Sequence, residues 1–265
     1  MPEIPIYQID AFTSRPFAGN PAAVCPLESW LPDETLLAIA AENNLAETAF
    51  FVRNGDHFDL RWFTPAVEVE LCGHATLASG SLILERLEPS WKQVAFETKS
   101  GTLVVKRAAA GRWSLDLPAR PPVPAIVTTD LVEALGSRPT YALQSRDLIA
   151  VYDNAEMVRR VKPDMGRIAA LPTFAVAITA PGSHADGDVD FVSRFFAPAK
   201  GVPEDPVTGS MHCSLVPYWA DRLGRTQLRA RQVSARGGEL ECTLHDGRVV
   251  LEGGAVMVLE GKMRF

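Results

Sequence analysis

The first half of the chain shows helix and strand patterns in a regular order. A helix is predicted to begin at Pro32, because proline is favoured at the first helical position and two acidic residues follow it. Residues 47–52 and 57–64 are apolar, strand-like runs separated by an Asn-Gly turn. Residues 75–87 are rich in Ala, Ser and Gly and almost free of charge, which predicts a helix buried among strands. Further strands are predicted at 93–98, 102–108 and 113–117.

The second half of the chain repeats this pattern at an offset of 133 residues. Phe-Thr-Pro-Ala at 63–66 recurs as Phe-Ala-Pro-Ala at 196–199, and Cys72 and Asp205 each follow seven residues after the respective proline. A proline-rich linker, residues 118–124, lies between the halves. We therefore expect two related domains, residues 1–117 and 118–254. Strands are predicted in the second at 147–152, 173–179 and 188–196, with a second central helix from about Gly209.

These patterns predict an α+β fold of two pseudo-symmetric, barrel-like halves, each with antiparallel strands around one central helix. A helix N-terminus offers unpaired N–H groups and the positive end of its dipole, and together these bind carboxylates. One such end in each half is supplied by Gly73-His74-Ala75-Thr76 and by Thr208-Gly209-Ser210. If the halves are related by a pseudo-two-fold axis, both ends converge on one interdomain cleft. The alternative is that these glycines only permit tight turns.

Composition and charge narrow the classes of function. The chain has 265 residues, of which 47% are hydrophobic, so it has enough apolar surface for a folded core. It carries 26 Lys and Arg against 32 Asp and Glu and has no basic stripe, which argues against a nucleic-acid binder. No apolar run reaches the length of a membrane span, and the N-terminus does not resemble a signal peptide, so a cytoplasmic location is expected.

Cysteine and histidine spacing gives no support for a metal or disulfide framework. The four cysteines are far apart in the sequence, and the five histidines form no metal-binding spacing such as His-Glu-x-x-His. No nucleotide or flavin motif is present either. We expect no metal and no cofactor.

Several motifs together resemble those of the PhzF-like family, named for a phenazine-biosynthesis isomerase that acts on trans-2,3-dihydro-3-hydroxyanthranilate. The resemblance covers almost the whole chain. It rests on NPAAV at 20–24, NLAETAFF at 44–51, LCGHAT at 71–76, EDPVTGS at 204–210, HCSLVPYWADRLG at 212–224 and QVSARGG at 232–238.

The resemblance implies the diaminopimelate epimerase fold, with the active site between two similar halves. It also implies that a last strand, at about 255–265, returns to the first domain, and that the protein is a homodimer without a cofactor. The expected activity is the shift of a proton on a small carboxylate-bearing substrate, such as a cyclic amino-acid-like molecule, within a biosynthetic process.

By this resemblance, Glu47 corresponds to the family's acid/base carboxylate. Apolar neighbours, Ala46 and Phe50 among them, would partly desolvate the carboxyl group and raise its pKa towards the range useful for proton transfer. Glu47 would then take a proton from one carbon and return it to another, in an allylic 1,3-shift. Without the resemblance, a surface glutamate at a strand start would be the better interpretation.

His74 and Asp205 correspond to the family's other catalytic positions, and their individual roles stay open. His74 would otherwise be a helix cap, and Asp205 a turn residue before proline. Asp10 and Asn20 are expected to shape the site. The substrate carboxylate is expected to bind at Gly73, Gly209 and Ser210.

Two alternatives remain open at this stage. The first is a two-thiol racemase or epimerase on the same fold, which needs a cysteine at the start of each central helix. Cys72 fits the first place, but Asp205 occupies the second and Cys213 lies farther along the helix. The second alternative is a small-molecule binding protein without turnover.

Ala46 stands where many family members have a serine beside the glutamate, which argues against the phenazine-pathway substrate as the natural one.

Overall fold

The chain folds into two compact units, each built from a sheet and helices. The computed structural model describes residues 1–265 except for the side chain of His184. The first unit consists of residues 1–116 and 252–265, and the second of residues 117–251. The chain passes from one unit to the other within β8 (Trp113–Pro118) and back within β17 (Arg248–Gly253).

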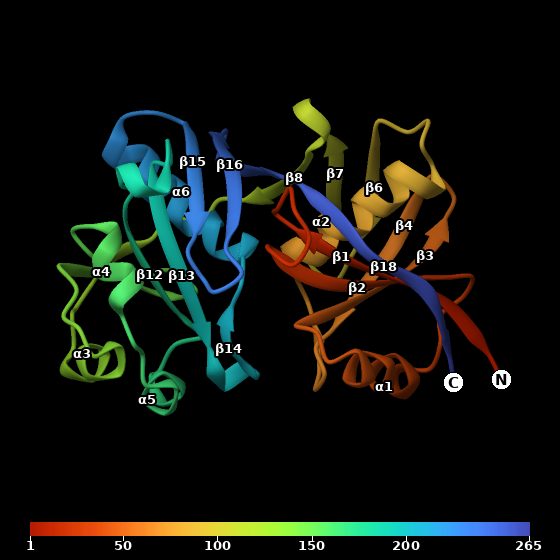
Figure 1. The fold of residues 1–265 in the computed structure, drawn as a ribbon, viewed down its shortest axis with the longest axis horizontal. Coiled ribbons are helices and arrows are strands. Elements are labelled where there is room, and N and C mark those ends of the chain that lie inside the picture. The colour runs from red at the N-terminus through yellow and green to blue at the C-terminus, as the bar shows by residue number, and fades with distance from the viewer. The chain divides into compact units, whose positions relative to one another are not determined.

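The sheet of the first unit begins with the last strand of the chain. Its hydrogen-bonded order is β18, β1, β2, β3, β4, β6, β7 and β8, with the short β5 antiparallel to β4. Glu3 lies opposite Arg264, and the N–H of Phe265 donates to the Pro2 carbonyl, so the two chain ends lie side by side (Figure 1). The strands are β1 (Glu3–Ala11), β2 (Asn20–Leu27), β3 (Glu47–Asn54), β4 (His57–Phe63), β5 (Glu68–Val69), β6 (Gln93–Glu97), β7 (Leu103–Arg107) and β18 (Ala255–Arg264).

The sheet curls around α2 (Gly73–Leu82), which contacts the end strand β18, β7 near the other end, and β1, β2 and β3 between them (Figure 1). All ten residues of α2 are buried. Small residues permit this close approach: a Cβ on Gly80 would lie 2.5 Å from the Val105 side chain. The helix continues as a π-helical turn, Ile83–Leu87. The small-residue helix predicted from residue 75 is thus present and begins two residues earlier.

α1 (Asp33–Asn43) covers the outer face of the same sheet. Its first turn is acidic, and Leu36 and Ile39 pack with Phe50 and Phe63 of the strands. α1 connects β2 to β3, and α2 lies in the connection from β4 to β6. These crossovers make the pairs β2–β3 and β4–β6 parallel, which the sequence patterns did not predict. The remaining pairs are antiparallel, as predicted.

The second unit has the same strand topology. From β9 to β13 the pairings are antiparallel, antiparallel, parallel and antiparallel, and β15 then pairs parallel to β13 and antiparallel to β16. This sequence of pairings matches that from β18 to β7 in the first unit, which confirms two halves of one architecture. The strands are β9 (Val123–Ala125), β10 (Tyr141–Gln144), β11 (Leu148–Val151), β12 (Val176–Pro181), β13 (Phe191–Ala197), β14 (Val202–Asp205), β15 (Gln227–Gln232) and β16 (Gly238–His245).

The central helix of the second unit is α6 (Gly209–Leu223), which packs against β15 and β16. Three short helices, which the sequence patterns did not indicate, form a second apolar cluster with β11, β12 and β13. They are α3 (Thr129–Leu135), α4 (Ala155–Arg160) and α5 (Met165–Ala170), and short 3-10 turns lie at Ala109–Gly111, His184–Asp186 and Pro198–Lys200.

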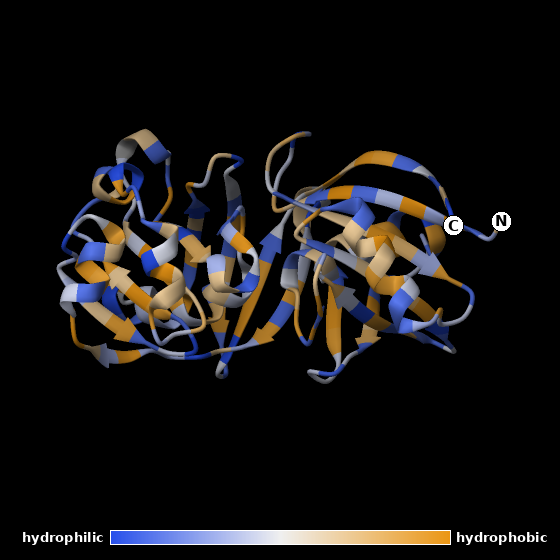
Figure 2. Cartoon of the chain, turned by 90° about the horizontal axis from the view of Figure 1, so that it is seen from below, coloured by the Kyte–Doolittle hydropathy of each residue, from blue (hydrophilic) through white to orange (hydrophobic). Residues whose placement is uncertain are grey.

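Hydropathy follows the layers within each unit. In Figure 2 the strands that lead to the two chain ends carry hydrophilic and hydrophobic segments in turn, as expected for strands with one face on a core. Among the described residues, no helix has the length and apolar character needed to cross a membrane.

Candidate functional site

Two of the predicted catalytic residues meet at one end of the sheet in the first unit. β2 and β3 are parallel, with Ala22 opposite Glu47, so their N-terminal ends lie at the same edge. Asn20 is the first residue of β2, and Glu47 is the first residue of β3. His74 is the second residue of α2, which packs on both strands. Three segments far apart in the sequence therefore bring their polar ends together.

Glu47 and His74 are in contact. Glu47 Oε2 lies 3.4 Å from His74 Nε2, and the exposed fractions of the two side chains are 17% and 5%. The other ring nitrogen, Nδ1, lies 3.1 Å from Nδ2 of the buried Asn20. The Glu47 side chain is thus partly exposed, whereas the imidazole of His74 is almost completely buried.

His74 is a neutral imidazole near pH 7. Burial lowers its pKa to about 3, and a hydrogen bond with the Pro21 backbone, which favours the charged ring, opposes this only in part. The contact with Glu47 is therefore not an ion pair, and the ring places no full positive charge beside the carboxylate.

Cys72 is the N-cap residue of α2, but its side chain makes no capping hydrogen bond. Its carbonyl accepts hydrogen bonds from the Thr76 N–H and from Thr76 Oγ1, and its Sγ lies 3.5 Å from His74 Nδ1. Glu47, Cys72 and His74 offer three metal-ligating atoms within 4.8 Å of one another.

Asp205 belongs to a network at the start of α6 in the second unit. It is the last residue of β14, and its carboxylate accepts a short hydrogen bond from Thr208 Oγ1. Gln232, which is fully buried, donates to the Asp205 carbonyl at 2.6 Å and accepts from the Thr208 N–H at 2.8 Å. Gln232 thereby fixes the chain on both sides of the turn that leads into α6.

An arginine borders the first turn of α6. Gly209 is the buried first residue of the helix, and the half-buried Ser210 accepts a hydrogen bond from Arg146 at 3.1 Å. Arg146 is held by two 3.0 Å contacts to Asp147, which is 2% exposed. Burial raises the pKa of Asp147, and the guanidinium of Arg146 opposes the shift. The Arg146 guanidinium, paired with the Asp147 carboxylate, is therefore fixed beside Ser210.

Farther along α6, His212 and Cys213 are buried inside the unit. His212 Nδ1 donates to the Thr208 carbonyl at 2.8 Å, and burial lowers the pKa of His212 to about 4. Burial raises the pKa of the Cys213 thiol to about 11. Both residues are fully covered, which suits structural roles.

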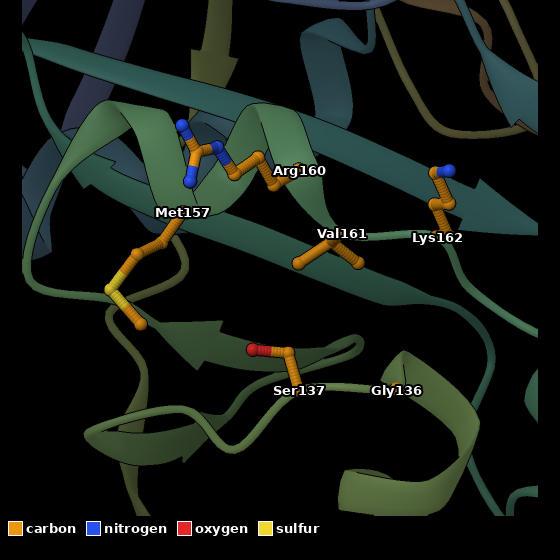
Figure 3. A pocket seen from close by; sticks show the side chains of 6 residues that line it. All are labelled: Gly136, Ser137, Met157, Arg160, Val161 and Lys162. Carbon is orange, nitrogen blue, oxygen red and sulfur yellow. The ribbon is translucent and has the colours of Figure 1, made fainter.

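A hollow of about 360 Å³ in the second unit lies between the end of α3 and α4. Figure 3 shows the side chains of Met157, Arg160 and Val161 on one side and Ser137 on the other. None of its lining residues is among the predicted site residues.

The predicted site residues thus form two groups. Glu47, Gly73 and His74 lie together in the first unit, and Asp205, Gly209 and Ser210 lie together in the second. The sequence patterns did not single out Arg146 or Gln232. Gln232 opens the QVSARGG motif and so had a signal, whereas Arg146 had none.

Comparisons with known proteins identify the family. The family model described as phenazine biosynthesis-like protein matches residues 9–261. A Pseudomonas aeruginosa protein named as an uncharacterized isomerase is 49% identical, over 99% of both chains. A crystal structure of a PhzF-family protein from Enterococcus faecalis superposes with a TM-score of 0.95 at 41% identity and covers all of both chains.

More distant structures share only the fold. A probable proline racemase from Agrobacterium radiobacter, 12% identical, gives a TM-score of 0.67 over 99% of this chain and 92% of its own. The fold is therefore shared with a probable racemase. The chain belongs to the phenazine biosynthesis-like (PhzC-PhzF) family and is an enzyme of the isomerase class.

Proposed function

We propose that this isomerase moves a proton between carbon atoms of a small carboxylate-bearing substrate, with Glu47 as the general acid and base and without a cofactor. The observation that carries the proposal is the contact between the Glu47 carboxylate and the neutral, buried His74 ring at 3.4 Å. A carboxylate on a partly exposed side chain, in contact with a fixed polar group, is suited to proton transfer.

The proposed reaction balances with one proton. The Glu47 carboxylate removes a proton from a carbon atom of the substrate and becomes a carboxylic acid. The electron pair left on the substrate is delocalised through an adjacent unsaturated bond. Glu47 then returns the proton to a second carbon, so the substrate is isomerised and the enzyme is unchanged.

The second group of residues is proposed to bind polar groups of a small carboxylate-bearing molecule. The first-turn N–H groups of α6, at Gly209 and Ser210, suit a carboxylate, and the Arg146 guanidinium adds hydrogen-bond donors beside Ser210. Asp205 suits an amino or hydroxyl group, because its carboxylate is an acceptor held by Thr208. Gly73 supplies the equivalent first-turn N–H at α2.

Solvent-deuterium exchange tests the proposal. The purified enzyme would be incubated in D2O with trans-2,3-dihydro-3-hydroxyanthranilate and a panel of cyclic and unsaturated amino acids, and deuterium at carbon followed by mass spectrometry. For any substrate that exchanges, we expect Glu47→Gln to lower the rate by a factor of about 100 or more. Glu42→Gln, which changes an exposed glutamate of α1, is the matched control and should exchange at the wild-type rate. Full exchange by Glu47→Gln would refute the assignment.

The two alternatives predict different results. A two-thiol racemase needs an ionisable thiol in each unit, but the Cys213 thiol is fully buried with its pKa raised to about 11. A binding protein without turnover would bind a member of the panel tightly and show no exchange.

The homodimer implied by the resemblance stays a prediction, which light scattering of the purified protein tests.

A further inference from the structure

Asn20 contacts the ring nitrogen of His74 that does not face Glu47. Its Nδ2 lies 3.1 Å from His74 Nδ1, and the two residues are 0% and 4% exposed. An amide Nδ2 carries only donor hydrogens, so Nδ1 must accept this hydrogen bond with its lone pair. A neutral imidazole has one proton, which then belongs to Nε2.

The alternative protonation would set two donors against each other. A proton on Nδ1 would point at the Asn20 amide at 3.1 Å, and the lone pair of Nε2 would face the Glu47 carboxylate at 3.4 Å. Both contacts would be repulsive. In a buried site, polar groups without a hydrogen-bond partner destabilise the folded state most. The Pro21 backbone also forms a hydrogen bond with the ring. Because a carbonyl can only accept, it favours a proton on the ring nitrogen that it faces and competes with the other neighbours of the ring. Cys72 Sγ, at 3.5 Å from Nδ1, is the other neighbour of that nitrogen.

We propose that Asn20 is a positioning residue that holds neutral His74 in its Nε2–H form, so that the ring presents a donor to the Glu47 carboxylate. The catalytic meaning of this role rests on the function proposed above. With a donor opposite, Glu47 rests as a carboxylate and starts the cycle as a base. With a lone pair opposite, Glu47 would be favoured as a carboxylic acid that donates to Nε2.

The tautomer can be measured without any substrate. Long-range proton–nitrogen NMR spectra of histidine-labelled protein report which ring nitrogen carries the proton, and the His74 signal is assigned by its loss in His74→Gln. We expect the Nε2–H form in the wild type. In Asn20→Asp the carboxylate can only accept, so we expect the proton to appear on Nδ1. Asn54→Asp adds the same charge at the opposite end of β3 and should leave the His74 signal unchanged.

Activity supplies the second measurement. We expect Asn20→Asp to lower the deuterium-exchange rate by a factor of about 100, through kcat more than KM, with Asn54→Asp unaffected. An Nδ1–H ring in the wild type, or an unchanged tautomer in Asn20→Asp, would overturn the positioning role. A switched tautomer with unchanged exchange would instead refute the proposed function of the Glu47–His74 pair, so the two failures are distinguishable.

Discussion

The buried histidine of α6 makes the stability of the protein depend on pH in a way that can be calculated. His212 is fully buried, and its pKa falls from 6.5 to about 4 on folding because the charged ring loses its solvation. Below pH 6.5 the unfolded chain therefore binds a proton that the folded chain does not. Stability falls as the pH falls, and the loss is complete below the folded pKa of about 4.

The magnitude follows from the two pKa values. Between about pH 7.5 and about pH 5, His212 alone should reduce the free energy of unfolding by about 2 kcal/mol, and below about pH 4 the loss approaches 3 kcal/mol. His74 acts in the same direction, because its pKa is also lowered on folding. The wild type should therefore lose the contributions of both rings.

A variant separates the two histidines. His212→Asn keeps an amide donor near the Thr208 carbonyl but has no titrating ring. Urea unfolding would be followed for both proteins at about pH 7.5 and about pH 5, and the variant should lose about 2 kcal/mol less than the wild type. The smaller side chain lowers stability at both pH values, so it does not affect the difference. Equal pH dependence of the two proteins would refute the reasoning.

Two further substitutions test the site and the core. Cys72→Ala should keep the deuterium-exchange rate within a factor of about three, because Glu47 is the proposed base, and a loss of exchange would favour thiol chemistry instead. Gly80→Ala should destabilise the first unit by about 1–3 kcal/mol in urea unfolding, because the added Cβ would lie 2.5 Å from the Val105 side chain. Gly261→Ala, where no atom lies within 4 Å of the added Cβ, is the control and should change stability by less than about 1 kcal/mol. Equal stability of the two glycine variants would contradict the packing of α2.

The architecture could be predicted because the same pattern of helices and strands occurs in both halves of the sequence. The strand at Glu47 and the helix after Cys72 have clear local patterns, and the second half repeats their order. The helices α3, α4 and α5 are only six or seven residues long, too short for an apolar period to stand out. Their signal was in their caps: Thr128, Asn154 and Asp164 each accept a hydrogen bond from the first turn.

The side-chain contacts within the candidate site could not be predicted from the sequence. Asn20 and His74 are 54 residues apart, and their contact depends on the parallel register of β2 and β3 beneath α2. Gln232 reaches Thr208 across 24 residues for a similar reason, because β15 returns beside the start of α6. Residue type and local spacing predict candidate catalytic groups, whereas tertiary pairing decides which other residues contact them.

The pairing of β18 with β1 has a consequence for the order of folding. Residues 117–251 form the second unit without interruption, so this unit can close as soon as they leave the ribosome. The first unit, which holds Glu47 and His74, is complete only when residues 252–265 have been synthesised, so the proposed proton-transfer groups are assembled last. Because the Phe265 N–H already meets the Pro2 carbonyl, a short peptide joining the two ends, with new ends opened in an exposed loop of the second unit, would let the first unit be synthesised without a gap.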